Sequence, residues 1–272
     1  MDKKQLAQRA ISVRRSILSM VHRSGSSHVG SALSAVDMLV YLYGVQFTEN
    51  KPSDVVYVDR ERFLLSKGHA CTAVYATLAE FGYFQKESLE TYAQNGSVFM
   101  SHVSSCVPGV EFSTGSLGHA LPVAVGMAHA ARLAGRQNGV HVLLSDGELN
   151  EGSNWEAFIL AAQLKLDNLH VLVDRNGLQG LGETNSIMRI DAIKEQLELF
   201  GWECAQVDGH NFDALNHAYC SFVKKDAPKC IIADTVKGKG VSFMENSVAW
   251  HYKSPNAAEY GLALSELEVL YA

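Results

Sequence analysis

The stretch VHVLLSDGELNEG, residues 140–152, joins a nearly continuous apolar run to an acid, a glycine and two further acids. Apolar and branched residues from Val140 to Leu144 are typical of a strand that is buried on both faces of a sheet. Asp146 and Gly147 end that run abruptly. A solvated turn is one interpretation of this junction. The alternative is a ligand site at the end of a buried strand.

Short apolar runs of the same kind recur along the chain and alternate with stretches of helical periodicity. This alternation predicts right-handed strand–helix–strand units and hence an α/β fold of three layers, α/β/α, with a mainly parallel central sheet. We expect strands at 62–66, 140–145, 169–174, 202–207 and 229–234. We expect helices at 3–22, 34–43, 67–81, 86–94, 119–134, 153–165, 191–200 and 211–225.

Composition limits the class of protein. The 272 residues are 47% hydrophobic and 19% charged, with neither repeat nor linker, so we expect a single domain over 1–272. A net charge of −6 without a basic stripe argues against nucleic-acid binding. Five separated cysteines without a CxxC pair indicate free thiols in a reducing compartment. The charged N-terminus and the lack of an apolar run of about 18 residues argue against a signal peptide and a membrane span, so we expect a cytoplasmic location.

Asp146 and Asn176 form a candidate metal site. They are 30 residues apart, and each lies just past the carboxyl end of an expected strand, so both can lie at the same edge of the sheet. A carboxylate, an amide oxygen and a nearby carbonyl, for which we choose Leu178, are hard ligands suited to Mg²⁺ or Ca²⁺. The N–H of Gly147 can approach a phosphate closely. Two ordinary loop turns remain the alternative on these residues alone.

Five blocks of sequence carry a resemblance to a known family. The SDG at 145–147, followed 30 residues later by RN, resembles the Gly-Asp-Gly and Asn-Asn fingerprint of thiamine diphosphate enzymes. The other four blocks are SGSSHVGSALSAVDML (24–39), DRERFLLSKGHA (59–70), MSHVSSCVPGVEFSTGSLGHA (100–120) and DTVKGKGVSFMENSVAWHY (234–252). Each resembles a transketolase segment, and their order is the same. The chain therefore resembles the N-terminal, diphosphate-binding module of the transketolase family.

The resemblance implies roles for individual residues. Asp146, Asn176 and the Leu178 carbonyl would hold Mg²⁺ or Ca²⁺ against the diphosphate of thiamine diphosphate. The cofactor would also contact His69, Gly115, Leu117, Gly147, Glu148 and His251. The residues that would surround the reactive thiazolium carbon and shuttle protons are His28, His69, His102 and His251, because imidazole titrates near the working pH. Glu151 would face a subunit interface.

Each of these roles has a structural alternative. Without the blocks, His28 and His102 would be taken for surface or packing residues. Glu148 could be a solvated acid of a first helical turn, and Glu151 a simple acid at a helix N-terminus, favoured by the helix dipole. Five positions depart from the family pattern, and they put the donor and acceptor preference in doubt: Val29, His119, Ala120, Ser145 and Arg175.

The resemblance also implies a partner. In the family, the glutamate that activates the cofactor belongs to a second α/β module, whereas this sequence ends at Ala272. We expect a subunit of a split transketolase that transfers a two-carbon ketol unit from a ketose, expected to be phosphorylated, to an aldose. It would be inactive without a partner that carries the pyrimidine-binding and C-terminal modules. The chain would form a homodimer alone or an α2β2 heterotetramer.

Other functions remain open on the sequence. The α subunit of a 2-oxo acid dehydrogenase shares the fold and metal motif, but it would lack the SKGHA and WH blocks. A fragment of a deoxyxylulose-phosphate synthase is a further enzyme alternative. The departures from the pattern also allow a non-catalytic, degenerate homologue that acts as a binding partner.

Overall fold

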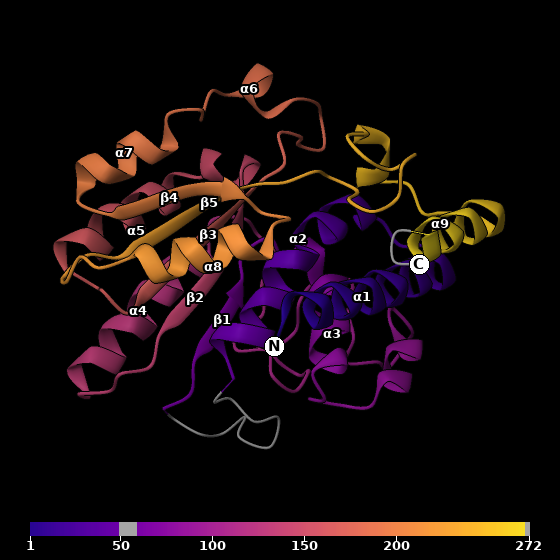
Figure 1. The fold of residues 1–272 in the computed structure, drawn as a ribbon, viewed down its shortest axis with the longest axis horizontal. Helices are drawn as coiled ribbons and strands as arrows, with labels where there is room; N and C mark the ends of the chain where they lie inside the picture. The colour runs from indigo at the N-terminus through magenta and orange to yellow at the C-terminus, as the bar shows by residue number, and fades with distance from the viewer. Residues whose placement is uncertain (49–58, 270–272) are drawn as a thin grey trace.

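A parallel sheet organises the part of the chain that the structure, a computed structural model, describes: residues 1–48 and 59–269. Within those residues five strands form one sheet in the order β1-β2-β3-β5-β4, and every neighbouring pair is parallel (Figure 1). The strands are β1 (Arg62–Leu65), β2 (Val140–Ser145), β3 (Leu169–Arg175), β4 (Glu203–Asp208) and β5 (Lys229–Asp234). All five lie where the apolar runs predict them.

Helices cover both faces of the sheet, which confirms the expected α/β/α architecture (Figure 1). The α-helices are α1 (Lys3–Ser24), α2 (Val29–Tyr41), α3 (Cys71–Glu80), α4 (Ala120–Leu133), α5 (Gly152–Gln163), α6 (Thr184–Ile187), α7 (Ile193–Phe200), α8 (Phe212–Ser221) and α9 (Ala257–Val269). Shorter helical turns are η1 (Leu42–Gln46), η3 (Gly68–Ala70), η4 (Lys86–Thr91), η5 (Gly147–Asn150) and η6 (Val248–His251).

The alternation of side chains along each strand divides the core in two. On β2, Val140, Val142 and Leu144 pack with α4, α5 and α7, whereas Leu143 packs with α1, α2, α3 and α8. Successive side chains of a strand point to opposite faces, so a strand between two helical layers needs apolar residues at every position. This requirement explains why apolar residues follow one another along the strands instead of alternating with polar ones.

Polar contacts cap helix α1 and join it to α2 within their helical layer. Asp2 and Gln5 form a capping box at the start of α1, and Gly25 ends the helix in the left-handed conformation. Inside the layer, Arg14 of α1 donates to Asp37 of α2 over 2.6 Å, and both side chains are buried. These contacts fix the direction in which the chain leaves α1, immediately before His28.

Some expected helix boundaries are wrong. Helix α2 begins at Val29 rather than at 34; its first residues are as buried as its last, and the His28 side chain before it makes no capping hydrogen bond. The expected helix at 86–94 is a shorter 3-10 turn, and the one at 211–225 ends at Ser221. Helix α9 is not predicted from the sequence, because only Ala263 and Leu267 of it are buried and they form no clear apolar stripe.

The apolar segment Val29–Gln46 corrects a second expectation. It is long and apolar enough to cross a membrane, although no such run is expected from the sequence. In the structure, 89% of it is buried inside the protein, where α2 contacts α1, α3 and α8. Burial on all sides accounts for its composition, as in the core helix of a globular domain.

Candidate active site

The carboxyl ends of β1, β2, β3 and β5 meet at one edge of the sheet, where the candidate metal ligands lie. The register pairs Ser145 of β2 with Asp174 of β3, so the loops that follow these two strands start side by side. Asp146 begins the first loop and Asn176 lies in the second. Together with Leu178 they line one cavity of about 550 Å³. The structure therefore brings the three sequence-predicted ligands together.

Asp146 is an acid held by neutral donors. Only 1% of it is exposed. One carboxylate oxygen accepts from the N–H of Gly147 at 2.7 Å, and the other accepts from the N–H of Gly177 at 2.7 Å and the hydroxyl of Thr184 at 3.2 Å. Burial raises the pKa of Asp146, and the nearby Asp174 raises it further, against these donors. A bound cation would relieve this cost of holding the charge.

The other two candidate oxygens are also held in place. The side-chain oxygen of Asn176 accepts from the N–H of Leu178 at 3.1 Å. The carbonyl of Leu178 accepts from the Lys237 ammonium at 2.9 Å. Each of these oxygens has two lone pairs, so one hydrogen bond leaves each able to accept a further partner.

The residues present fit a magnesium diphosphate. A carboxylate, an amide and a carbonyl form a set of hard oxygen donors. Across residues 1–48 and 59–269, no group of three or more His, Cys, Asp or Glu side chains is placed to hold a metal, which argues against a zinc-type site in that part of the chain. The amide nitrogen of Gln179 is buried and finds no acceptor among the described residues. It lies over Gly147, where an added Cβ would stand 2.7 Å from the Gln179 side chain. A free amide donor beside a glycine that has no side chain suits an anionic group.

Four histidines from distant parts of the sequence form a cluster. The ring centroid of His28 lies 5.0 Å from those of His69 and His251, and 6.1 Å from that of His102. His69 and His251 are 5.7 Å apart. The backbone of His28 is left-handed, with φ of 74°, and its N–H donates to the His251 carbonyl at 2.8 Å. These are the four histidines that the sequence blocks single out.

Burial and neighbouring cations keep most of the cluster neutral. Burial lowers the pKa of both His28 and His251 to about 4, and the ammonium of Lys237 contributes to the shift. Burial also holds the pKa of His69 well below its usual value, with Lys67 as the next cause. Near neutral pH each of these three rings therefore offers one donor and one acceptor nitrogen.

Two buried lysines lie beside the candidate site, and sequence reasoning missed both. Lys67 is fully buried; its ammonium donates to the Ser31 carbonyl at 2.9 Å and forms an ion pair with Asp174. Lys237 is only 1% exposed, and burial lowers its pKa to about 8, with Lys67 as the next cause. Lys67 lies in the block at 59–70 and Lys237 in the block at 234–252. Lysines are rarely buried, so only their histidine neighbours drew attention.

The predicted residues of the 100–120 block lie on the histidine side of the site. An added Cβ at Gly115 would stand 3.7 Å from the ring of His102, so the two are neighbours. Leu117 is half-buried, and its carbonyl lies 3.0 Å from Nδ1 of His119. Thr114 anchors this loop to the sheet, because its hydroxyl donates to the Leu65 carbonyl at 2.7 Å. None of them lines the cavity of Asp146.

Glu148 is completely buried, so the alternative of a solvated acid is wrong. Its carboxylate accepts from the hydroxyl of Ser66, from the N–H of Gly118 at 2.8 Å and from the N–H of Ser145 at 3.2 Å. Burial raises the pKa of Glu148 against these three donors. Glu148 thus joins the end of β1, the end of β2 and the loop before α4. It supports the site from beneath.

Glu151 is exposed at the position that precedes α5. Its side chain makes no capping hydrogen bond to that helix. It does pack against the 115–118 loop, since a Cβ at Gly118 would meet the Cβ of Glu151 at 2.6 Å. The carboxylate is therefore available to a partner beside the site.

Comparison with known proteins agrees with this geometry. The family described as transketolase, thiamine diphosphate binding domain, matches residues 6–264. The chain belongs to the transketolase family. This finding confirms the resemblance drawn from the five sequence blocks.

Two kinds of transketolase resemble this chain. It is 41% identical to an apulose-4-phosphate transketolase subunit of Actinobacillus succinogenes, covering 97% of this chain and 96% of that protein. It is 34% identical to the 6-deoxy-6-sulfo-D-fructose transketolase subunit SqwG of a Clostridium species, covering 97% and 96%. The solved transketolase of Campylobacter jejuni superimposes with a TM-score of 0.91 at 28% identity. The match covers 98% of this chain, but only 43% of that protein.

Departures from the transketolase pattern leave the candidate ligands in place. Ser145 donates its N–H to Glu148, and Val29 is fully buried at the start of α2. His119 is exposed. Arg175 lines the cavity of Asp146 and pairs with Asp234 at 2.5 Å. A cation thus stands where the transketolase pattern has an uncharged amide.

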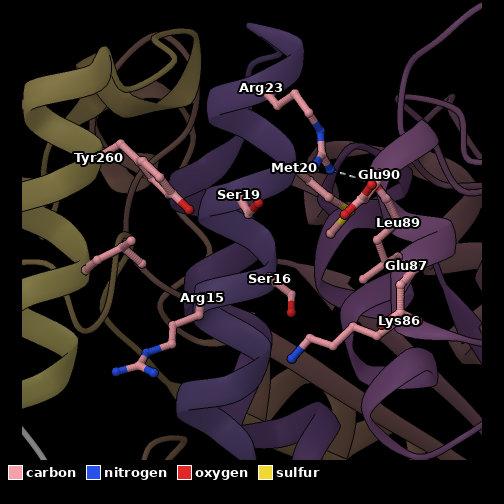
Figure 2. Close-up of a pocket in the computed structure, with 11 residues that line it drawn as sticks. Arg15, Ser16, Ser19, Met20, Arg23, Lys86, Glu87, Leu89, Glu90 and Tyr260 are labelled. Carbon is pink, nitrogen blue, oxygen red and sulfur yellow. Dashed lines mark hydrogen bonds between the residues drawn. The ribbon is translucent and has the colours of Figure 1, made fainter.

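A second cavity, of about 400 Å³, lies between α1, α9 and η4 of this transketolase chain (Figure 2). Its cationic side chains already have partners. Arg23 donates to the Leu89 carbonyl at 3.0 Å, Arg15 pairs with Glu268 at 3.3 Å and Lys86 contacts Ser12. None of the predicted site residues lines this cavity.

Proposed function

We propose that this chain is the diphosphate-binding subunit of a two-subunit, thiamine diphosphate-dependent transketolase. One observation carries the proposal: three hard oxygen ligands and four histidines gather at the same edge of the sheet. The relatives named as apulose-4-phosphate transketolase subunits support it, because they match this chain over nearly their whole length. The solved transketolases are more than twice as long as the region that matches this chain.

In this proposal Asp146, Asn176 and the Leu178 carbonyl hold Mg²⁺, or Ca²⁺ in its place. Gly147 offers its N–H to the diphosphate, and Gln179 adds a side-chain amide. The remaining residues proposed to contact the cofactor are His69, His251, Gly115, Leu117 and the buried Glu148. When bound, thiamine diphosphate supplies the nucleophilic carbon that accepts and releases the two-carbon unit.

The histidines bind and orient the sugar through defined nitrogens. The Lys237 ammonium lies 3.1 Å from Nδ1 of His251. An ammonium can only donate, so Nδ1 accepts and the ring proton sits on Nε2, free to donate to a substrate oxygen. His28 contacts the Ser27 hydroxyl through Nδ1 at 3.2 Å, which likewise leaves its Nε2 for the substrate. His69 and His102 complete the ring of polar contacts.

The cations beside the histidines have a second role in the proposal. Lys67 and Lys237 disfavour protonation of the neighbouring rings, which keeps an acceptor available on each. The same two ammonium groups offset the negative charge of a diphosphate and its acidic neighbours Asp146 and Asp174. The site can therefore bind an anionic cofactor and still exchange protons with sugar hydroxyls.

The reaction proposed is transfer of a two-carbon ketol unit from a phosphorylated ketose to an aldose. A partner chain supplies the pyrimidine-binding and C-terminal modules, including the glutamate that activates the cofactor, and Glu151 faces a subunit interface. We propose an α2β2 assembly, or a homodimer when this chain is alone. We also propose that residues 1–272 form one domain, of which residues 49–58 and 270–272 lie outside those described. A cytoplasmic location is proposed as well.

Cofactor-dependent stabilisation tests the binding half of this proposal. Thiamine diphosphate with Mg²⁺ at a hundred-fold excess over Kd is expected to stabilise the chain by about 2.7 kcal/mol, and a chelator is expected to remove the effect. Asp146→Asn should abolish the stabilisation. Asp191→Asn is the matched control, because Asp191 lines the same cavity but pairs with Arg189. Equal stabilisation of the Asp146 variant and the wild type would refute the assigned metal site.

A further inference from the structure

Two of the five cysteines meet on neighbouring strands, far from the histidine cluster. Cys204 is the second residue of β4 and Cys230 the second residue of β5, and the register pairs them directly. Separated thiols are expected from the sequence, because the two positions are 26 residues apart. Parallel pairing through α8 brings them side by side, which sequence spacing cannot show.

The geometry of this pair suits a disulfide. Neighbouring strands lie about 4.8 Å apart, and disulfides join Cα atoms that are about 4.4–6.8 Å apart. Register partners in a parallel pair project to the same face, and both cysteines pack into the core layer of α5 and α7. The interaction with the Cys204 thiol is the first cause, before burial, of the raised pKa of Cys230. The two sulfur atoms therefore face each other.

The two thiols differ in access to solvent. Cys230 is completely buried, whereas Cys204 is half-buried on β4, the edge strand of the sheet. The half-buried Cys204 is the thiol that a dissolved oxidant can reach, so it has the position of an attacking thiol, and the buried Cys230 has that of a resolving one.

We propose that Cys204 and Cys230 form a reversible dithiol–disulfide pair that responds to hydrogen peroxide. The Cys204 thiolate attacks one peroxide oxygen, the O–O bond breaks and hydroxide leaves, giving a sulfenic acid at Cys204. The sulfur of Cys230 then attacks the Cys204 sulfur, the S–O bond breaks, and the Cys230 proton leaves with the hydroxide as water. Two thiols are oxidised to one disulfide while one peroxide is reduced to two waters. A dithiol reductant reverses the step by exchange at the half-buried Cys204.

The disulfide would fasten the edge of the sheet. Strand β4 pairs on one side only, with β5, and most of its residues are partly exposed. A covalent link near its start closes the loop that contains α8 and restrains β4 against local opening. This inference does not depend on the proposed function, because neither cysteine lines the cavity of Asp146.

Thiol counting on the full chain tests the proposal. After hydrogen peroxide treatment and denaturation, free thiols are expected to fall from five to three per chain, with a mass loss of about 2 Da for the two hydrogens removed. Peptide mapping without reductant should find Cys204 linked to Cys230, and dithiothreitol should restore all five thiols. Hydrogen exchange at residues 203–208 should slow in the oxidised form.

Variants separate this pair from the exposed thiols. In Cys230→Ala, a Cys204 sulfenic acid should accumulate and be trapped by dimedone; in Cys204→Ser, the buried Cys230 should stay reduced. The double variant Cys106→Ser/Cys220→Ser removes the two exposed thiols and should still form the disulfide. The proposal is overturned if five thiols survive in the wild type, or if the only links found involve Cys106 or Cys220.

Discussion

Replacement of Lys67 with methionine would test how the buried charges of the site are held. The Lys67 ammonium and the Asp174 carboxylate are both fully buried and form an ion pair. Methionine keeps most of the side-chain volume but removes the charge. Asp174 would retain the hydroxyls of Ser34, at 2.5 Å, and Thr235, but no cation among the described residues would form an ion pair with it. The variant therefore isolates the cost of an unpaired buried acid.

The expected loss of unfolding free energy is about 3–5 kcal/mol at neutral pH, the usual cost of breaking a buried ion pair on one side. Burial alone would raise the pKa of Asp174, but Lys67 and the hydroxyl donors hold this pKa below its usual value. In the wild type, the Asp174 carboxylate therefore adds to the free energy of unfolding above the unfolded pKa of about 3.9, and this stabilisation is lost as the pH falls. Without Lys67, burial raises that pKa, so the loss should shrink as the pH is lowered and the acid becomes neutral.

Urea unfolding followed by circular dichroism at two pH values measures this loss. The double variant Lys67→Met/Asp174→Asn should recover much of the stability, since no charge then remains unpaired. Lys86→Met is the control for the substitution itself, because Lys86 is half-exposed and should cost less than about 1 kcal/mol. A loss below about 1 kcal/mol for Lys67→Met, or an equal loss in the double variant, would refute this reasoning.

Further predictions concern the turn after β1 and the histidines. Gly68→Ala would place a Cβ 2.5 Å from the Thr114 carbonyl, and it should lower the free energy of unfolding in urea by about 1–3 kcal/mol. At Gly126 an added Cβ meets no atom within 4 Å, so Gly126→Ala should raise the free energy of unfolding by about 0.5–1 kcal/mol through a more stable α4. The pKa of His28 and of His251 is about 4, below the usual 6.5. The unfolded chain therefore binds more protons between these values, so stability should fall as pH drops from about 6.5 to about 4. His28→Asn should flatten that slope in denaturation curves taken across the range, and an unchanged slope would contradict the assignment.

The sheet and its two helical layers could be predicted from sequence because burial on both faces leaves a direct mark. Continuous apolar runs occur where a strand lies between helices, as in Val140–Ser145 and Lys229–Asp234. The starts and ends of helices are harder to predict from the sequence. His28 precedes α2 in a left-handed conformation without capping it, and α9 buries only two of its side chains. Neither feature leaves a periodic pattern.

Half of the site could be read from the sequence and half could not. Asp146, Asn176 and the histidines occur in recognisable blocks, and the parallel strands place Asp146 and Asn176 at one edge. The burial of Lys67 and Glu148 arises from packing between segments that are distant in sequence. A lysine or a glutamate in a polar block resembles a surface residue until its neighbours are known. The pairing of cysteines across parallel strands is hidden for the same reason.

Reconstitution of activity tests the central claim most directly. This chain would be mixed with a partner carrying the pyrimidine-binding and C-terminal modules, thiamine diphosphate and Mg²⁺, and ketol transfer from a phosphorylated ketose to an aldose would be measured. We predict transfer only when both chains are present, and its loss in Asp146→Ala. Transfer by this chain alone, or undiminished transfer by that variant, would contradict the account.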